Sequence, residues 1–139
     1  MYTEAVATEL FYQESPLLKE ALIGLEQRQP KKTLATLDQL ERRFPVGRLG
    51  DEVALARIDA LPELARFPDV LSLLDGMALS SGLRRHELRV IRGELRLSAH
   101  RYDEAIADFS LELAGKNAIG ERARQGMREC RTQKSTDEP

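Results

Sequence analysis

The chain is poor in the residues that build disulfide frameworks, aromatic binding surfaces and membrane spans. Its 139 residues include one cysteine, no tryptophan and only 5% aromatic residues. The single cysteine, Cys130, excludes an internal disulfide framework. No apolar run approaches the roughly 18 residues that a spanning helix needs, so we expect no insertion into a membrane. The sequence therefore predicts a protein held together by an ordinary aliphatic core.

Neither sign of charge dominates the sequence. Lysine and arginine number 21 against 23 aspartate and glutamate residues, which gives a formal net charge of −2. Without a strong global field, nucleic acid is not predicted as a partner, and any electrostatic binding must depend on local patches. We expect a cytoplasmic protein, or a periplasmic one if the chain is a piece of a longer anchored protein.

No arrangement of side chains predicts catalysis or metal binding. His86 and His100 lie far apart in the sequence, and neither stands beside a nucleophile motif. Cys130 has no second cysteine or histidine within a helical turn, so metal-ligand spacing is missing. The segment 47–50 lacks the lysine and the serine or threonine of a phosphate-binding loop. We predict no catalytic residue, no metal site and no cofactor.

The sequence does contain apolar residues at helical spacing between turn-forming residues. No segment alternates with a period of two for long enough to predict a strand, so the predicted fold class is all-α. Pro62 is expected to end or kink the third helix near Ala60. The predicted helices are 16–29, 30–44, 51–61, 69–79, 88–99, 102–113 and 118–131.

The two ends of the chain are expected to differ from its middle. Residues 132–139 are polar and lack apolar anchors, so they are predicted to be a disordered tail. Residues 1–13 include Leu10 and Phe11 and are expected to form an N-terminal extension or a short packed helix. The helical repeat domain is therefore predicted to span residues 14–131.

An internal repeat is the most informative feature of the sequence. Residues 52–74 are echoed by residues 87–109, thirty-five residues later. Units of this period cannot bury their apolar faces alone and must stack on their neighbours. The repeat therefore predicts stacked helical hairpins, a class that usually binds other proteins. Aligned pairs include Arg57 with Arg92, Arg66 with Arg101, Phe67 with Tyr102 and Asp69 with Glu104.

The segment from Arg92 to Phe109 resembles a tetratricopeptide repeat, and two preceding units resemble it more weakly. In that family a glycine in the first helix and an alanine opening the second let the helices approach closely, roles that fall on Gly93 and Ala105. Two aromatic residues fill the groove between the helices, roles that fall on Tyr102 and Phe109. The resemblance implies a right-handed stack of about three antiparallel helical hairpins with a C-terminal capping helix.

The same resemblance implies a non-catalytic adaptor whose concave groove binds an amphipathic helix of a protein partner. Two other occupants of the groove stay open: residues 1–13 of the same chain, or a second copy in a homodimer. Residues 42–45 also resemble helical repeat regions of bacterial signalling and envelope proteins, so the alternative is a structural or regulatory self-association domain of such a protein. The tetratricopeptide resemblance implies that the groove is lined by Leu18, Leu22, Leu25, Leu55, Asp59, Val90, Glu94 and Leu97.

Four arginines are expected to form a ridge along one side of the fifth helix, because they recur at i, i+4, i+7 and i+11. A structural role would pair each guanidinium with a carboxylate of an adjacent helix. A functional role would use the ridge, together with His86, to bind an acidic segment or a phosphate. We favour the structural role because acidic residues are plentiful. The ridge comprises Arg85, Arg89, Arg92 and Arg96, and its candidate partners are Asp59, Asp75, Asp103, Asp108 and Glu112.

Overall fold

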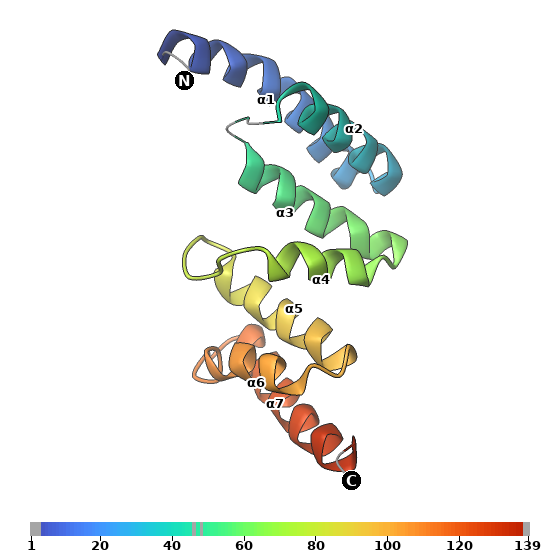
Figure 1. The fold of residues 1–139 in the computed structure, drawn as a ribbon, viewed down its shortest axis with the longest axis vertical. Coiled ribbons are helices and arrows are strands. Elements are labelled where there is room, and N and C mark those ends of the chain that lie inside the picture. The colour runs from blue at the N-terminus through green and yellow to red at the C-terminus, as the bar shows by residue number, and fades with distance from the viewer. Residues whose placement is uncertain (1–3, 46, 48, 138–139) are drawn as a thin grey trace. The chain divides into compact units, whose positions relative to one another are not determined.

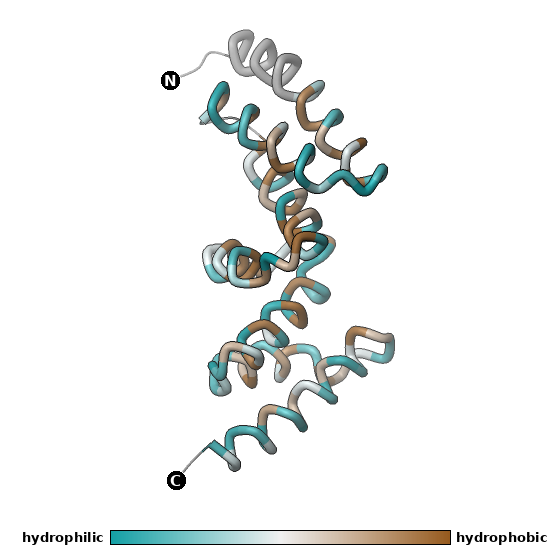
Figure 2. The backbone as a smooth tube through the Cα atoms, turned by 90° about the vertical axis from the view of Figure 1, so that its right-hand side faces the viewer, coloured by the Kyte–Doolittle hydropathy of each residue, from teal (hydrophilic) through white to brown (hydrophobic). Residues whose placement is uncertain are grey.

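The computed structural model describes residues 4–45, 47 and 49–137, and all regular structure in these residues is helical (Figure 1). The predicted all-α fold class is therefore confirmed. Polar and apolar residues alternate along the helices (Figure 2), and none of the described helices is both long and apolar enough to cross a membrane. The chain forms two compact units, Met1–Val70 and Leu71–Pro139.

Unit 1 is built from a long helix, its antiparallel partner and a third helix that ends in a 3₁₀ turn. The long helix and its partner approach closely at Gly24, where an added Cβ would lie 2.6 Å from the Thr33 Oγ1 atom. That hydroxyl donates a hydrogen bond to the carbonyl of Ala21 at 3.1 Å. The elements are α1 (Glu4–Glu26), α2 (Pro30–Arg43), α3 (Gly50–Ala60) and η1 (Leu61–Leu64), and the buried core consists of Ala21, Leu37, Leu40, Val53 and Ala56.

The start of α1 differs from the prediction. Pro16 was expected to open the first helix, but α1 begins at Glu4 and runs through the proline. An interior proline removes one backbone donor from the helix, and the good helix formers on both sides keep the remaining turns intact. The N-terminal extension predicted over residues 1–13 is therefore helical from Glu4, and residues 1–3 lie outside the described residues.

The predicted effect of Pro62 is confirmed. Helix α3 ends at Ala60, and the chain continues as the 3₁₀ helix η1, which contains the proline. A proline at this point has no N–H to donate to the preceding turn, so the α-helical hydrogen-bond ladder stops there.

The same backbone closure ends three of the hairpin helices. Arg28, Ala65 and His100 all have left-handed backbones, with φ values of 56°, 55° and 60°. At the third closure the N–H of His100 bonds to the Leu97 carbonyl at 3.0 Å, and the following N–H bonds to the Arg96 carbonyl at 2.8 Å. This pair of bonds is a Schellman motif, and the first two closures repeat its pattern. The sequence repeat is thus matched by a repeated turn.

The boundary between the two units falls inside helix α4 (Phe67–Asp75), so unit 2 begins within this helix. Its last helix continues past the predicted end at Arg131 and into the segment predicted to be disordered. The sixth predicted helix ends early, because residues 111–114 form a turn. The helices that follow α4 are α5 (Arg85–Ser98), α6 (Tyr102–Ser110) and α7 (Ala118–Asp137).

The Phe109 ring is the centre of the core of unit 2. An added Cβ on Gly93 of α5 would lie 2.8 Å from this ring, and one on Gly126 of α7 would lie 2.4 Å from it. The ring therefore fills the space that two glycines leave open on neighbouring helices. The buried core consists of Val90, Leu97, Ala105, Phe109, Ala123, Met127 and Cys130.

Candidate functional site

The predicted groove does not extend along α5. Val90 and Leu97 were expected to line it, but both are buried in the core of unit 2. The reason is that α5 packs against both α6 and α7, so its apolar stripe is already covered. Glu94 is partly exposed and accepts a hydrogen bond from the Arg122 guanidinium of α7 at 3.1 Å.

The face of α1 is more open. Leu18 and Leu25 are half-buried against the core of unit 1, whereas Leu22 retains 46% of its exposure. Its neighbour Ile23, which the helical stripe did not predict, is 44% exposed. Leu22 lies at the edge of the half-buried stripe of Leu18 and Leu25, and Ile23 lies further round the helix. We call these four residues the α1 face. The other groove residues of unit 1 both lie on α3, where Leu55 is half-buried and Asp59 is exposed.

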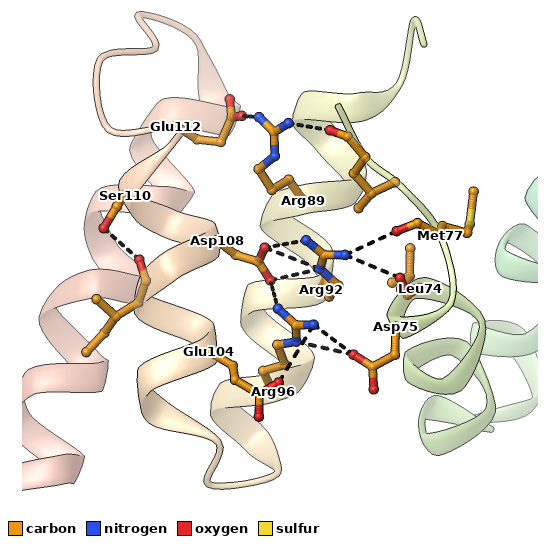
Figure 3. Close-up of polar contacts among 12 residues, drawn as sticks. Leu74, Asp75, Met77, Arg89, Arg92, Arg96, Glu104, Asp108, Ser110 and Glu112 are labelled. Carbon is orange, nitrogen blue, oxygen red and sulfur yellow. Dashed lines mark hydrogen bonds and ion pairs between the residues drawn. The ribbon is translucent and has the colours of Figure 1, made fainter. Parts of the chain in front are cut away.

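The arginine ridge meets a buried carboxylate on α6 (Figure 3). Arg92 donates to both carboxylate oxygens of Asp108, with Nη2 to Oδ1 at 2.7 Å and Nε to Oδ2 at 3.0 Å. Arg96 donates to Oδ2 of the same residue at 2.8 Å. The Asp108 side chain is only 3% exposed. Two guanidinium groups therefore share one buried carboxylate.

The other side of the ridge meets the end of α4 and the segment that follows it (Figure 3). The Arg92 Nη1 atom lies 3.3 Å from the Leu74 carbonyl, and Arg89 donates to the Leu79 carbonyl. Arg96 pairs with Asp75 at 2.9 Å. The last carbonyls of a helix lack partners within it, and cations stabilise that end. The ridge therefore fastens the end of α4 to α5 and α6.

Glu112 is a second buried carboxylate, and it pairs with Arg89 and with the half-exposed His86. Its carboxylate lies 2.5 Å from Arg89 Nη1 and 2.8 Å from His86 Nδ1. Burial acts to raise the pKa of Glu112, but the hydrogen bonds from His86 and Arg89 outweigh it and hold that pKa below its ordinary value. The first residue of the ridge, Arg85, donates to the Gly82 carbonyl at 2.9 Å.

These contacts give the ridge a structural role. Three of the five candidate carboxylates pair with it: Asp75, Asp108 and Glu112. Asp103 instead accepts from Lys134 of α7 at 2.8 Å. The Arg89, Arg92 and Arg96 side chains are largely buried, so they do not form an open surface for an acidic segment or a phosphate.

The lowered pKa values of Asp75 and Glu112 make unit 2 sensitive to acid. The hydrogen bond from Arg101, joined by that from Arg96, lowers the pKa of Asp75 below its ordinary 3.8, and Glu112 lies below its ordinary 4.5. Both carboxylates stabilise the fold when they are ionised, and their contribution is complete at pH values above these ordinary pKa values. That contribution is lost as the pH falls through the lower folded-state values. We expect the free energy of unfolding to be level above about pH 5 and to fall below about pH 4.5.

Urea unfolding at a series of pH values measures this effect, with Glu112→Gln as the comparison. The glutamine cannot ionise, so the stability difference between the parent and the variant should shrink as the pH falls from 6 to 3. A difference that stays constant over this range would show that Glu112 keeps an ordinary pKa in the folded chain.

A hollow of about 450 Å³ lies where α5 and α7 begin and α6 has ended. Leu83 is fully exposed beside it, and Leu111 is two-thirds exposed. The sequence analysis missed both residues, because they stand in turns where no helical period marks them. We call this the Leu83 hollow. It is lined by Leu83, His86, Glu87, Leu111, Glu112, Gly115, Asn117 and Ile119.

A second hollow in unit 2, of about 380 Å³, is polar. Tyr102 donates a hydrogen bond to Asp137, which raises the pKa of Tyr102 to about 12. Lys134 pairs there with Asp103, and Arg101 with Glu104, while Asp137 lies 3.3 Å from the His100 Nδ1 atom. Across the described part of the chain, no group of three histidine, cysteine or acidic residues is placed to hold a metal ion.

No protein-family model, curated protein or solved structure matches this chain. The functional argument therefore depends on the residues and their geometry. The exposed apolar residues of the α1 face in unit 1 carry it.

Proposed function

We propose that the chain is a tetratricopeptide-like, non-catalytic adaptor that binds an amphipathic helix of a partner protein on the α1 face. The observation that carries this proposal is the exposure of Leu22 and Ile23, at 46% and 44%. The side of α1 that meets α2 is already packed, because Ala21 and Gly24 are buried where Thr33 of α2 approaches. Adjacent exposed apolar residues on such a helix mark a surface that a partner covers.

The spacing on α1 suits a helical partner. Leu18, Leu22 and Leu25 follow one another at i, i+4 and i+7, which is the spacing of anchors in helix-in-groove recognition. The exposed residues beside them carry both signs of charge, with Lys19 and Glu26 among them. The partner's apolar stripe would therefore supply most of the affinity, and the flanking charges would set its orientation.

Two features support the tetratricopeptide-like interpretation. Gly93 of α5 lies directly against the Phe109 ring of α6, which is the close approach that the family pattern implies. The closures at Ala65 and His100 use the same pair of backbone hydrogen bonds, thirty-five residues apart. The residue that follows each closure is an arginine, Arg66 or Arg101. Each of these arginines forms an ion pair with the acidic residue three positions later in the sequence.

Replacing Leu22 and Ile23 together with serine is expected to weaken partner binding by about tenfold or more, because each side chain is about half-exposed and its cover by a partner would contribute about half of the roughly 1.5–3 kcal/mol of full burial. The fold should survive, because both side chains are exposed. The measurement is a quantitative pull-down with the parent, the double variant and Leu83→Ser as baits. Binding of each recovered partner to the purified chains is then measured by fluorescence anisotropy.

A partner that is lost from the double variant and kept by Leu83→Ser would support the α1 face as the binding site. A partner that binds all three baits equally would contradict that assignment. If the parent captures nothing that binds it directly, the adaptor function itself fails.

A further inference from the structure

Helix α3 and the 3₁₀ helix η1 that continues it expose acidic residues and no base. Arg57 is the one base of these two elements, and it is largely buried, because it pairs with Asp38 and Glu41 of α2. The rest of α3 packs into the core of unit 1 through residues that include Val53 and Ala56. The exposed carboxylates of α3 and η1 include Asp51, Glu52 and Glu63.

This acidic side of α3 lies beside the leucines of α1. The two helices pack directly against each other, and Leu25 contacts the core to which Ala56 of α3 belongs. Glu52 stands one helical turn before Ala56 and therefore shares its side of α3. On α1 itself, Glu26 is exposed one turn after Leu22. The apolar row of α1 is therefore bordered by carboxylates on both helices.

We call Glu26 of α1, Glu52 of α3 and Glu63 of η1 the acidic border. Within the part of the chain that the structure describes, none of the three is held in an ion pair or a side-chain hydrogen bond. Lys19 is the one base of α1, and it lies one turn before Leu22. The three carboxylates outnumber this base, so the surface around the leucines has a net negative charge.

We propose that the helix bound on the α1 face is a basic amphipathic helix. Its apolar stripe covers Leu22 and Ile23, and the lysine or arginine residues beside the stripe pair with the acidic border. Complementary charges guide a partner to its site and fix its orientation there, whereas an acidic helix would place like charges together. The inference rests on the proposed function, because it assigns the chemistry of the partner at the same site.

Two synthetic helical peptides test this charge preference. Both have the same stripe of leucines, and they differ only in the residues beside the stripe, which are lysines in one peptide and glutamates in the other. Fluorescence anisotropy measures the binding of each labelled peptide to the full chain. We expect the lysine peptide to bind about tenfold more tightly, and this preference to shrink at high salt, because exposed charges are screened.

Neutralising the acidic border should remove the preference. The triple variant is Glu26→Gln, Glu52→Gln and Glu63→Gln, and its exposed glutamines keep the size of the side chains. We expect it to bind the lysine peptide about fivefold to tenfold more weakly than the parent does, because three exposed ion pairs are lost. Its affinity for the glutamate peptide should not fall.

The matched control removes the same number of exposed carboxylates from unit 2. Its substitutions are Asp103→Asn, Glu121→Gln and Glu129→Gln, so both triple variants have the same net charge. The control should bind the lysine peptide like the parent, because a local border and not the total charge selects the partner. Circular dichroism of each variant confirms that the helices are retained.

A preference for the lysine peptide that is lost in the border variant and kept in the control would support the proposal. Equal binding of the two peptides, or a preference that survives in the border variant, would overturn it. It is also overturned if the parent binds the lysine peptide no better than the double serine variant of Leu22 and Ile23 does. The proposed function fails separately, since a natural partner of any charge that is lost from that double variant keeps the α1 face as the binding site.

Discussion

Replacing Phe109 with alanine is expected to lower the free energy of unfolding by about 3–5 kcal/mol. The ring is fully buried and is the largest fully buried side chain of the described residues. It lies against Gly93 and Gly126 on two different helices. Glycines have no side chain that could move into the vacated space, so the cavity would stay open. The cost should therefore fall in the upper part of this range.

The measurement is urea-induced unfolding followed by circular dichroism. Phe67→Ala is the matched control, because the same side chain is removed from a position that is about half-exposed. We expect the control to change the stability by less than about 1 kcal/mol. Equal effects of the two substitutions would contradict the central position of Phe109 in the core of unit 2.

Replacing Asp108 with alanine is expected to lower the free energy of unfolding by about 3 kcal/mol, because it leaves buried guanidinium groups without their carboxylate. Arg92 would lose its charge-assisted hydrogen bonds to both carboxylate oxygens and retain backbone carbonyls such as that of Leu74. Arg96 would still hold Asp75, which places the cost at the lower end of the range for broken buried ion pairs.

Two further variants separate the lost ion pair from a general effect of removing a carboxylate. Asp103→Ala removes an exposed acid paired with Lys134 and should cost about 0–1 kcal/mol. Replacing Asp108, Arg92 and Arg96 together with leucine or methionine removes every member of the cluster and should recover most of the loss. If Asp108→Ala costs no more than Asp103→Ala, the buried network does not stabilise the fold.

The arginine ridge could be predicted from the sequence because helix geometry fixes its spacing. Residues at i, i+4, i+7 and i+11 must share one side of a helix, and nearby acidic residues had to face them. The partner of each arginine could not be assigned in the same way. Asp103 and Asp108 both belong to α6, but only Asp108 is on the side that meets α5, while Asp103 pairs with α7. That choice depends on the rotation of α6, which a single sequence does not specify.

The groove was predicted less well than the ridge. The resemblance placed Val90 and Leu97 on an open face of α5, but Ala123, Met127 and Cys130 of α7 share their core. The sequence analysis treated the last helix as a cap and did not assign its small residues to α5. Gly126 shows why the helices can meet so closely, since its missing side chain admits the Phe109 ring.

The end of α3 was predictable because Pro62 marks it, whereas α4 ends at Asp75 and not at Leu79, where the run of turn residues had predicted its end. The left-handed backbone that follows three of the helices was not predictable, because no glycine marks it. A helix end normally uses glycine at such a position because a side chain there costs energy. Arg28, Ala65 and His100 occupy it instead, so the usual sequence signal is missing from all three closures.

Those three closures show how the repeat is encoded. The Schellman hydrogen bonds join backbone atoms alone, so they can form with different residues at the turn, although each residue other than glycine costs energy there. An arginine, an alanine and a histidine can therefore hold equivalent positions and make the same bonds. The repeat in this chain is therefore clearer in its backbone torsion angles than in its amino-acid sequence. A comparison of sequences alone will underestimate how similar its helical hairpins are.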